Sequence, residues 1–229
     1  WNISSYYPTY SLDASAEDFY VLSTILEHVR SAKDVRGRFM WPEFEFSNME
    51  PWCESQGYLI NVDRDIELNY PPQQDEVARN TPLFNKEFHH WESPTITDEN
   101  MSILITSEFG ANQKGYKIAA FNSNEVVVGI GTIDSDGRCG LAVYGDDITT
   151  DNIEGLKKGE TFRLILWDKN LDTEVPLSTN AELKYESNGT INLATSAIYT
   201  IPNEFYLRQN FPNPFNDVTL IEFGLPDAF

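Results

Sequence analysis

Short apolar runs separated by polar turns fill the middle of the chain. They cover residues 117–121, 126–133, 139–144 and 162–167. Residues 126–130 read VVVGI, and β-branched side chains interrupted by glycine disfavour a helix and suit a half-buried strand. The links at 122–124 (NSN) and 134–137 (DSDG) consist of residues that favour tight turns. We therefore predict an antiparallel meander of three or four strands with one buried face.

The start of the chain predicts an opening strand and then one short helix. Residues 1–6 (WNISSY) alternate apolar and polar positions, as a strand does. Ser15 is a residue type that caps helices, and acidic residues follow it in the expected first turn. Apolar residues then recur at helical spacing, at Phe19, Leu22, Ile25 and Leu26. These features predict a helix over 16–27.

Two hairpins are predicted in the same region. The first pairs residues 29–33 with 38–41 around the DVRG turn at 34–37. The second pairs residues 57–62 with 66–70 around DRD.

The chain divides into four parts by composition. Residues 71–87 are polar, carry three prolines and show no sustained periodicity, which is typical of a linker. Further strands are predicted at 102–106, 181–185 and 191–199. The fold class is mainly β, in four parts: a small antiparallel sandwich-like module with one short helix at 1–70, the linker, a second sandwich-like module at 88–200, and a third segment at 201–229.

Composition indicates a folded chain and excludes two classes of partner. Of the 229 residues, 41% are hydrophobic and 13% aromatic, which is typical of a packed core. The formal net charge of −20 repels nucleic acids and anionic lipid surfaces, although it attracts divalent cations. No apolar run approaches the roughly 18 residues of a transmembrane segment. Because the chain starts at Trp1 without a signal peptide, we expect a mature or trimmed fragment.

Two acidic clusters are candidate calcium ligands. Asp134 and Asp136 resemble half of a calcium-binding loop, but Arg138 stands where a further ligand would be needed. A hairpin turn explains the same residues, and we favour that interpretation. Asp146 and Asp147 form the second cluster. Calcium is the one cofactor that the sequence suggests.

The cysteines, the histidines and the short motifs of the sequence indicate no active site. Cys53 and Cys139 could form a disulfide in an oxidising compartment, or remain free thiols, which is the more common case. His89 and His90 would point to opposite faces of a strand and could not readily chelate one ion. The motifs HExxH and GxSxG and a phosphate-binding glycine loop are all missing from the sequence. A Ser–His–Asp triad stays open, because its members need not be close in sequence, but no residues are singled out for one. The protein is therefore expected not to be an enzyme.

Aromatic residues suggest either a sugar-binding platform or core packing. The candidates are Tyr6, Tyr7, Trp41, Trp52, Trp91 and Trp167. In small β modules such residues more often fill the core, and we favour that interpretation. Trp167 ends an apolar run and is expected to be buried.

The end of the chain resembles a known export signal. Residues 205–216 read FYLRQNFPNPFN and residues 218–226 read VTLIEFGLP. This segment resembles the opening of the type A C-terminal sorting domain of the type IX secretion system of Bacteroidetes and relatives, in which a pattern close to LxQNYPNPFN precedes a threonine-rich strand and Leu-Pro. Phe211 replaces the usual Tyr. The matching positions are Leu207, Gln209, Asn210, Phe211, Pro212, Asn213, Pro214, Phe215, Asn216, Phe223, Leu225 and Pro226.

This resemblance implies a location and a partner. The sorting domain would be an immunoglobulin-like sandwich of which residues 201–229 are the first strands, so we expect the segment to be truncated and not exportable as it stands. The parent protein would enter the periplasm by a signal peptide. The type IX machinery would then carry it across the outer membrane, to be released or held at the cell surface.

The body of the chain also resembles uncharacterised β modules that precede such tails in secreted bacterial proteins. The resemblance lies in the opening WNISS and in residues 118–168. No site residue carries over from these modules. The export-like tail, the lack of catalytic motifs and the aromatic-rich β body together predict a non-catalytic secreted or cell-surface module for binding, adhesion or presentation, with a polysaccharide or a surface protein as the ligand. Two competing functions stay open: an accessory region of a larger secreted hydrolase whose catalytic domain lies upstream, and a structural spacer.

Overall fold

The structure, a computed structural model, is mainly β. It describes residues 1–74, 90–107, 113–147, 149–150 and 153–197 and, nearer the C-terminus, 206–210, 214, 219, 221 and 223–224. Strands hold 42% of the residues and helical turns 6%, in antiparallel and mixed sheets, so the predicted fold class is confirmed. Trp1–Ala197 form one compact unit and Ile198–Phe229 a second. Among the described residues, no helix is long and apolar enough to cross a membrane.

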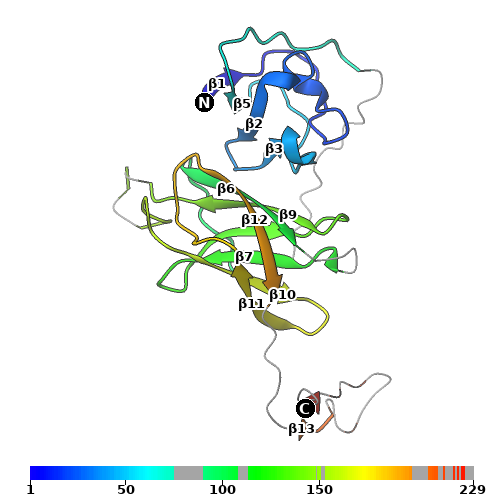
Figure 1. The fold of residues 1–229 in the computed structure, drawn as a ribbon, viewed down its shortest axis with the longest axis vertical. Helices are drawn as coiled ribbons and strands as arrows, with labels where there is room; N and C mark the ends of the chain where they lie inside the picture. The colour runs from blue at the N-terminus through cyan, green and yellow to red at the C-terminus, as the bar shows by residue number, and fades with distance from the viewer. Residues whose placement is uncertain are drawn as a thin grey trace. The chain divides into compact units, whose positions relative to one another are not determined.

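A five-stranded antiparallel sheet contains the first strands of the chain (Figure 1). Its order is β1 (Asn2–Ser5), β5 (Gly57–Val62), β2 (Val29–Asp34), β3 (Phe39–Trp41) and β4 (Phe46–Ser47). The opening strand and the β2–β3 hairpin lie where the sequence predicts them. The second predicted hairpin is wrong, because residues 66–70 form no strand. Instead, the Tyr70 ring packs edge-on against Tyr6 at 4.8 Å, closing the core of this sheet.

The predicted helix over 16–27 is also wrong. The segment forms two single 3₁₀ turns, η1 (Tyr20–Leu22) and η2 (Leu26–His28), and a third, η3 (Pro42–Phe44), follows β3. Phe19 has a φ of 49°, in the left-handed region that ends a right-handed helix. Both Val21 and Leu22 are fully buried. A segment that buries adjacent residues wraps over a core instead of presenting one helical face to it.

A seven-stranded sheet forms the rest of the first unit. Its order is β8 (Val127–Thr132), β7 (Lys117–Phe121), β10 (Arg163–Asp168), β11 (Thr173–Thr179), β12 (Thr190–Ala197), β6 (Asn100–Ser107) and β9 (Arg138–Tyr144). All neighbours are antiparallel except β12 and β6, which lie side by side in parallel (Figure 1). The four central strands exist as predicted, but they do not form a simple meander, because β8 and β9 stand at opposite ends of the order. The strand predicted at 181–185 is wrong, because these residues form only an isolated bridge, from Lys184 to Thr161.

The two end strands of this sheet approach each other closely. An added Cβ at Gly129 would lie 2.3 Å from the Ala142 carbonyl oxygen, and one at Gly131 would lie 2.5 Å from Cys139 Sγ. A single bridge between Ile133 and Cys139 joins the two strands where they turn. The sheet therefore curls around its own core. Its fully buried side chains include Ile103, Ile118, Val128, Leu141, Leu166 and Leu193.

The two sheets share a buried boundary inside the first unit. Leu104 on β6 packs against Phe39 and Phe46 of the five-stranded sheet, and all three are buried. The turn between β2 and β3 reaches the second sheet, where Tyr144 Oη donates to the Arg36 carbonyl at 2.6 Å. The end of the turn between β8 and β9 reaches back, because Arg138, the first residue of β9, donates from Nη1 to the Glu45 carbonyl at 3.0 Å. Each sheet thus inserts one turn against the other.

The second unit contains a short hairpin. Strands β13 (Tyr206–Leu207) and β14 (Phe223–Gly224) pair in antiparallel fashion. Asn210 Nδ2 donates to Thr219 Oγ1 at 3.0 Å between them. Tyr206 and Leu207 from the first half of the export-like motif therefore pair with Gly224 and Phe223 from the second half.

Candidate functional site

An aromatic and acidic cluster lies on the outer face of the seven-stranded sheet. Its members are His90, Trp91, Trp167 and Glu174, which we call the outer cluster. Strand β10 alternates, so Leu166 points into the core while Trp167 points outward and is half-buried. The expectation that Trp167 is buried is therefore wrong. Glu174 on β11 is the cross-strand partner of Trp167, which places a carboxylate beside the indole.

The side chains of the outer cluster contact one another directly. The His90 ring stacks on Trp167 with centroids 4.8 Å apart and planes 8° from parallel. Glu174 Oε1 lies 3.0 Å from His90 Nε2 and accepts a hydrogen bond from Trp91 Nε1 at 2.6 Å. Trp167 Nε1 donates to Asp172 Oδ1 at 3.0 Å. The cluster thus combines flat rings with carboxylate acceptors.

Strand β7 extends this surface. The Trp91 ring packs edge-on against Phe121 at 5.8 Å. The Arg163 guanidinium lies over the Phe121 ring, 5.1 Å from its centroid, and forms an ion pair with Glu125. Phe121 is buried under these neighbours. Half-buried aromatic rings beside exposed charges are suited to ligands that have both apolar faces and hydroxyl groups.

The remaining aromatic candidates do not join this surface. Tyr6 and Trp52 are buried in the core of the five-stranded sheet, where Trp52 stacks on Tyr58 at 3.7 Å. Trp41 packs edge-on against Phe44. Tyr7, which follows β1, is exposed and contacts Tyr70. The six predicted aromatic residues therefore divide between core and surface and form no single platform.

The acidic candidates serve as turn anchors. Asp134 Oδ1 accepts hydrogen bonds from the backbone of Asp136 at 2.9 Å and of Arg138 at 2.8 Å, and Asp136 pairs with the Arg138 guanidinium. Asp146 accepts from the Glu154 backbone. Hydrogen bonds from Thr149 hold the pKa of Asp147 below its usual value.

These bonds fit the turn interpretation of both acidic clusters. Within the described part of the chain, no group of three or more metal-binding side chains is arranged around one point. Calcium binding at these four residues stays a prediction.

Both cysteines are free thiols in this structure. Cys53 is exposed, with its sulfur 3.4 Å from Ser11 Oγ. Cys139 is buried in the core of the seven-stranded sheet, and this burial raises the pKa of its thiol to about 12. The pairing that the sequence left open is not formed.

The export-like motif is only partly described. Leu207, Gln209 and Asn210 lie on and after β13, Pro214 is exposed, and Phe223 lies on β14. The motif residues outside the described part are Phe211, Pro212, Asn213, Phe215, Asn216, Leu225 and Pro226. His89 also lies outside it.

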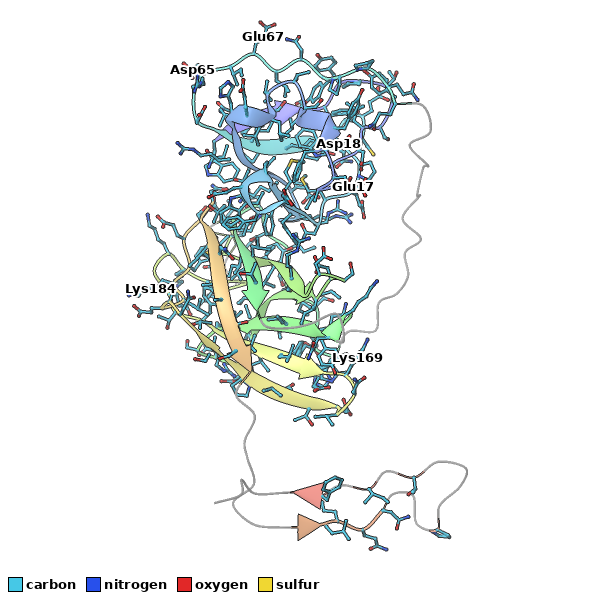
Figure 2. All side chains as sticks on the ribbon, turned by 45° about the vertical axis from the view of Figure 1, so that its right-hand side comes forward. Glu17, Asp18, Asp65, Glu67, Lys169 and Lys184 are labelled. Atoms are coloured by element: carbon cyan, nitrogen blue, oxygen red, sulfur yellow. The ribbon has the colours of Figure 1, made fainter. Side chains whose placement is uncertain are left out.

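Two open grooves border the sheets of the first unit. One is lined by polar residues of β6, β11 and β12, including Thr106, Ser178 and Ser196. The other groove is lined by residues before and within the η1–η2 segment and by the β8–β9 turn, with Glu17 and Arg138 among its lining residues. Four exposed acidic side chains, Glu17, Asp18, Asp65 and Glu67, project outward from the five-stranded part (Figure 2). These charges are solvated.

One buried polar pair at the boundary was missed by sequence reasoning. Lys33 on β2 and Asn100 at the start of β6 are each only 1% exposed. Desolvation lowers the pKa of Lys33 to about 8, although the charge of Glu99 acts in the opposite direction. A lysine in an alternating strand looks like a solvent-facing residue, so the pattern carried no signal for it.

Comparisons with protein-family models, curated proteins and solved structures found no match to this chain.

Proposed function

We propose that this chain is a non-catalytic part of a protein exported through the type IX secretion system. The proposal is supported by the motif at 205–226 and its resemblance to the opening of a sorting domain. The pairing of β13 with β14 is consistent with this resemblance, because it joins a described residue pair from each half of the motif in an antiparallel ladder. The destination is the cell surface or the medium, reached through the periplasm.

Export can be tested in the parent protein. In a bacterium with an active type IX system, we expect the full-length protein in the surface or medium fraction. Replacement of Asn213 and Pro214 by alanine should retain it in the periplasm, because these residues belong to the proposed recognition segment. A matched control replaces the exposed Glu67 and Asn69, which lie outside the motif. Normal export of the motif variant, or export from a strain without the machinery, would refute the proposal.

At its destination the module binds a polysaccharide. The outer cluster supports this choice, because flat rings beside carboxylates suit the apolar faces and hydroxyl groups of sugars. A surface protein is the second ligand class that would fit a binding role. An accessory role beside an upstream catalytic domain and a purely structural spacer role are the two competing functions.

Glycan-array binding and affinity electrophoresis test the ligand. Trp167→Ala should weaken polysaccharide binding at least about tenfold, a change of about 1.4 kcal/mol. Tyr7→Ala is the matched control, since Tyr7 is an exposed aromatic residue that follows β1 of the five-stranded sheet and lies outside the outer cluster. Equal losses in the two variants would argue against the outer cluster. No binding by the parent chain to any polysaccharide would favour the spacer.

A further inference from the structure

Lys33 and Asn100 meet in a buried contact between the two sheets. Lys33 Nζ lies 2.9 Å from Asn100 Oδ1 and 2.9 Å from the Asn100 backbone oxygen. Both residues are 1% exposed. Lysine is rarely buried to this extent. The Trp1 ring covers the amine, with its centroid 5.4 Å from Nζ.

The buried environment of the Lys33 amine favours a covalent reaction as well as packing. A lysine becomes a nucleophile when it loses its proton, and burial assists that loss. Here burial lowers the pKa of Lys33 to about 8, so a neutral fraction exists near neutral pH. The target carbon, Asn100 Cγ, is bonded directly to the Oδ1 atom that Nζ contacts. Two groups held together in this way react with a high effective concentration.

We propose that Lys33 and Asn100 join in an intramolecular isopeptide bond. The lone pair of neutral Nζ attacks Cγ, and the electrons of the C=O bond move to Oδ1. The intermediate collapses as the Cγ–Nδ2 bond breaks. Nδ2 takes one hydrogen from Nζ and leaves as ammonia. The product is a secondary amide whose remaining N–H stays close to the Asn100 backbone oxygen.

The reaction needs no oxidant or cofactor. Glu99 precedes Asn100, and its negative charge acts on the Lys33 amine. The bond would cross-link the two sheets through positions 67 residues apart. It would give the first unit a covalent tie that does not depend on redox state, since both cysteines are free thiols.

Intact-mass spectrometry of the denatured, reduced chain tests the bond. We expect the mass to fall below the sequence mass by one ammonia, about 17 Da. Lys33→Met should show its full sequence mass. Lys117→Met is the matched control, since Lys117 is also buried but contacts Thr132 Oγ1, and it should keep the deficit.

Peptide mapping distinguishes the bond from other losses of ammonia. Digestion of the parent chain should yield one branched peptide that contains both Lys33 and Asn100. A full sequence mass in the parent chain would overturn the proposal, whether or not the variants fold. A deficit accompanied only by linear peptides would overturn it too, because a cyclic imide at an asparagine loses the same mass.

Discussion

Single residues decide the turns of this protein. Asp34 and Asp134 each begin the pattern Asp-x-x-Gly-Arg. In both, the aspartate Oδ1 accepts backbone hydrogen bonds from the residues two and four positions later. Gly37 and Gly137 have φ values of 75° and 76°, which glycine adopts without strain. The same local sequence therefore gives the same turn in two places, and the carboxylate is already engaged.

The two thiols should react at very different rates. Cys53 is exposed, whereas Cys139 is buried and its pKa is raised to about 12. Because the thiolate is the reactive form, iodoacetamide at neutral pH should label the native chain at Cys53 alone. Both residues should be labelled in denaturant. Peptide mapping after timed labelling measures this, and rapid native labelling of Cys139 would contradict the buried placement.

Buried tyrosines should make the fold sensitive to strong base. Burial raises the pKa of Tyr58, Tyr144 and Tyr185 to about 12. A tyrosine whose pKa is raised by folding stabilises the folded state fully below its unfolded pKa of about 10. Its contribution to the free energy of unfolding is lost as the pH rises towards 12. Stability should therefore fall between about pH 10 and pH 12.

Urea titrations at several pH values measure this loss. Tyr144→Phe should make the decline shallower, whereas Tyr7→Phe, at an exposed site, should leave it unchanged. The same slope in all three proteins would refute the assignment.

At the scale of elements, the sequence predicted strands with local patterns and missed those shaped by distant partners. The β2–β3 hairpin and the four central strands follow from alternation and turn residues. Strand β11 was missed because Pro176 interrupts its pattern. In the structure β11 pairs with β10 up to Pro176 and with β12 from Leu177, so the proline stands where the strand changes partner. That arrangement cannot be read from a local window.

The candidate site was predictable only in part. Its tryptophans were named as possible sugar contacts, but core packing was favoured for them, and Trp167 on β10 was wrongly expected to be buried. The apolar run Leu164–Trp167 gives no alternation from which to choose the outward positions. Glu174 and His90 carried no signal, because their meeting depends on the pairing of β10 with β11. The site therefore forms only through tertiary contacts, which the local sequence does not show.

Glycines where β8 meets β9 should be essential to the curled sheet. An alanine at position 129 would place Cβ 2.3 Å from a backbone oxygen of β9, which cannot move aside easily. Gly129→Ala should therefore reduce the free energy of unfolding by about 1–3 kcal/mol. Chemical denaturation measures the change. Gly57→Ala is the control, because nothing lies within 4 Å of the added atom; equal effects would refute the close approach.

At the scale of the molecule, the first unit joins two sheets that the sequence predicted as separate modules. They meet through the apolar cluster of Leu104, Phe39 and Phe46, and through the two inserted turns. Buried apolar contact of this kind couples folding, since opening one side exposes the other.

Truncation of the shared cluster should loosen both sheets together. Leu104→Ala removes a fully buried side chain and should cost about 2–5 kcal/mol. Hydrogen exchange should then accelerate in both β2 and β6. Ile3→Ala, at a side chain that is 85% exposed, should change little. Faster exchange confined to β6 would show that the sheets open independently.

The parallel pairing of β12 with β6 determines how this unit would carry tension. β12 ends at Ala197, and its partner β6 begins at Asn100, which contacts Lys33 of the five-stranded sheet. In a parallel pair, the end of one strand and the start of the other lie at opposite ends of the ladder. A pull applied to them would slide the strands lengthwise and load all the ladder hydrogen bonds together instead of unzipping them one by one. The unit is thus built to resist stretching along that line.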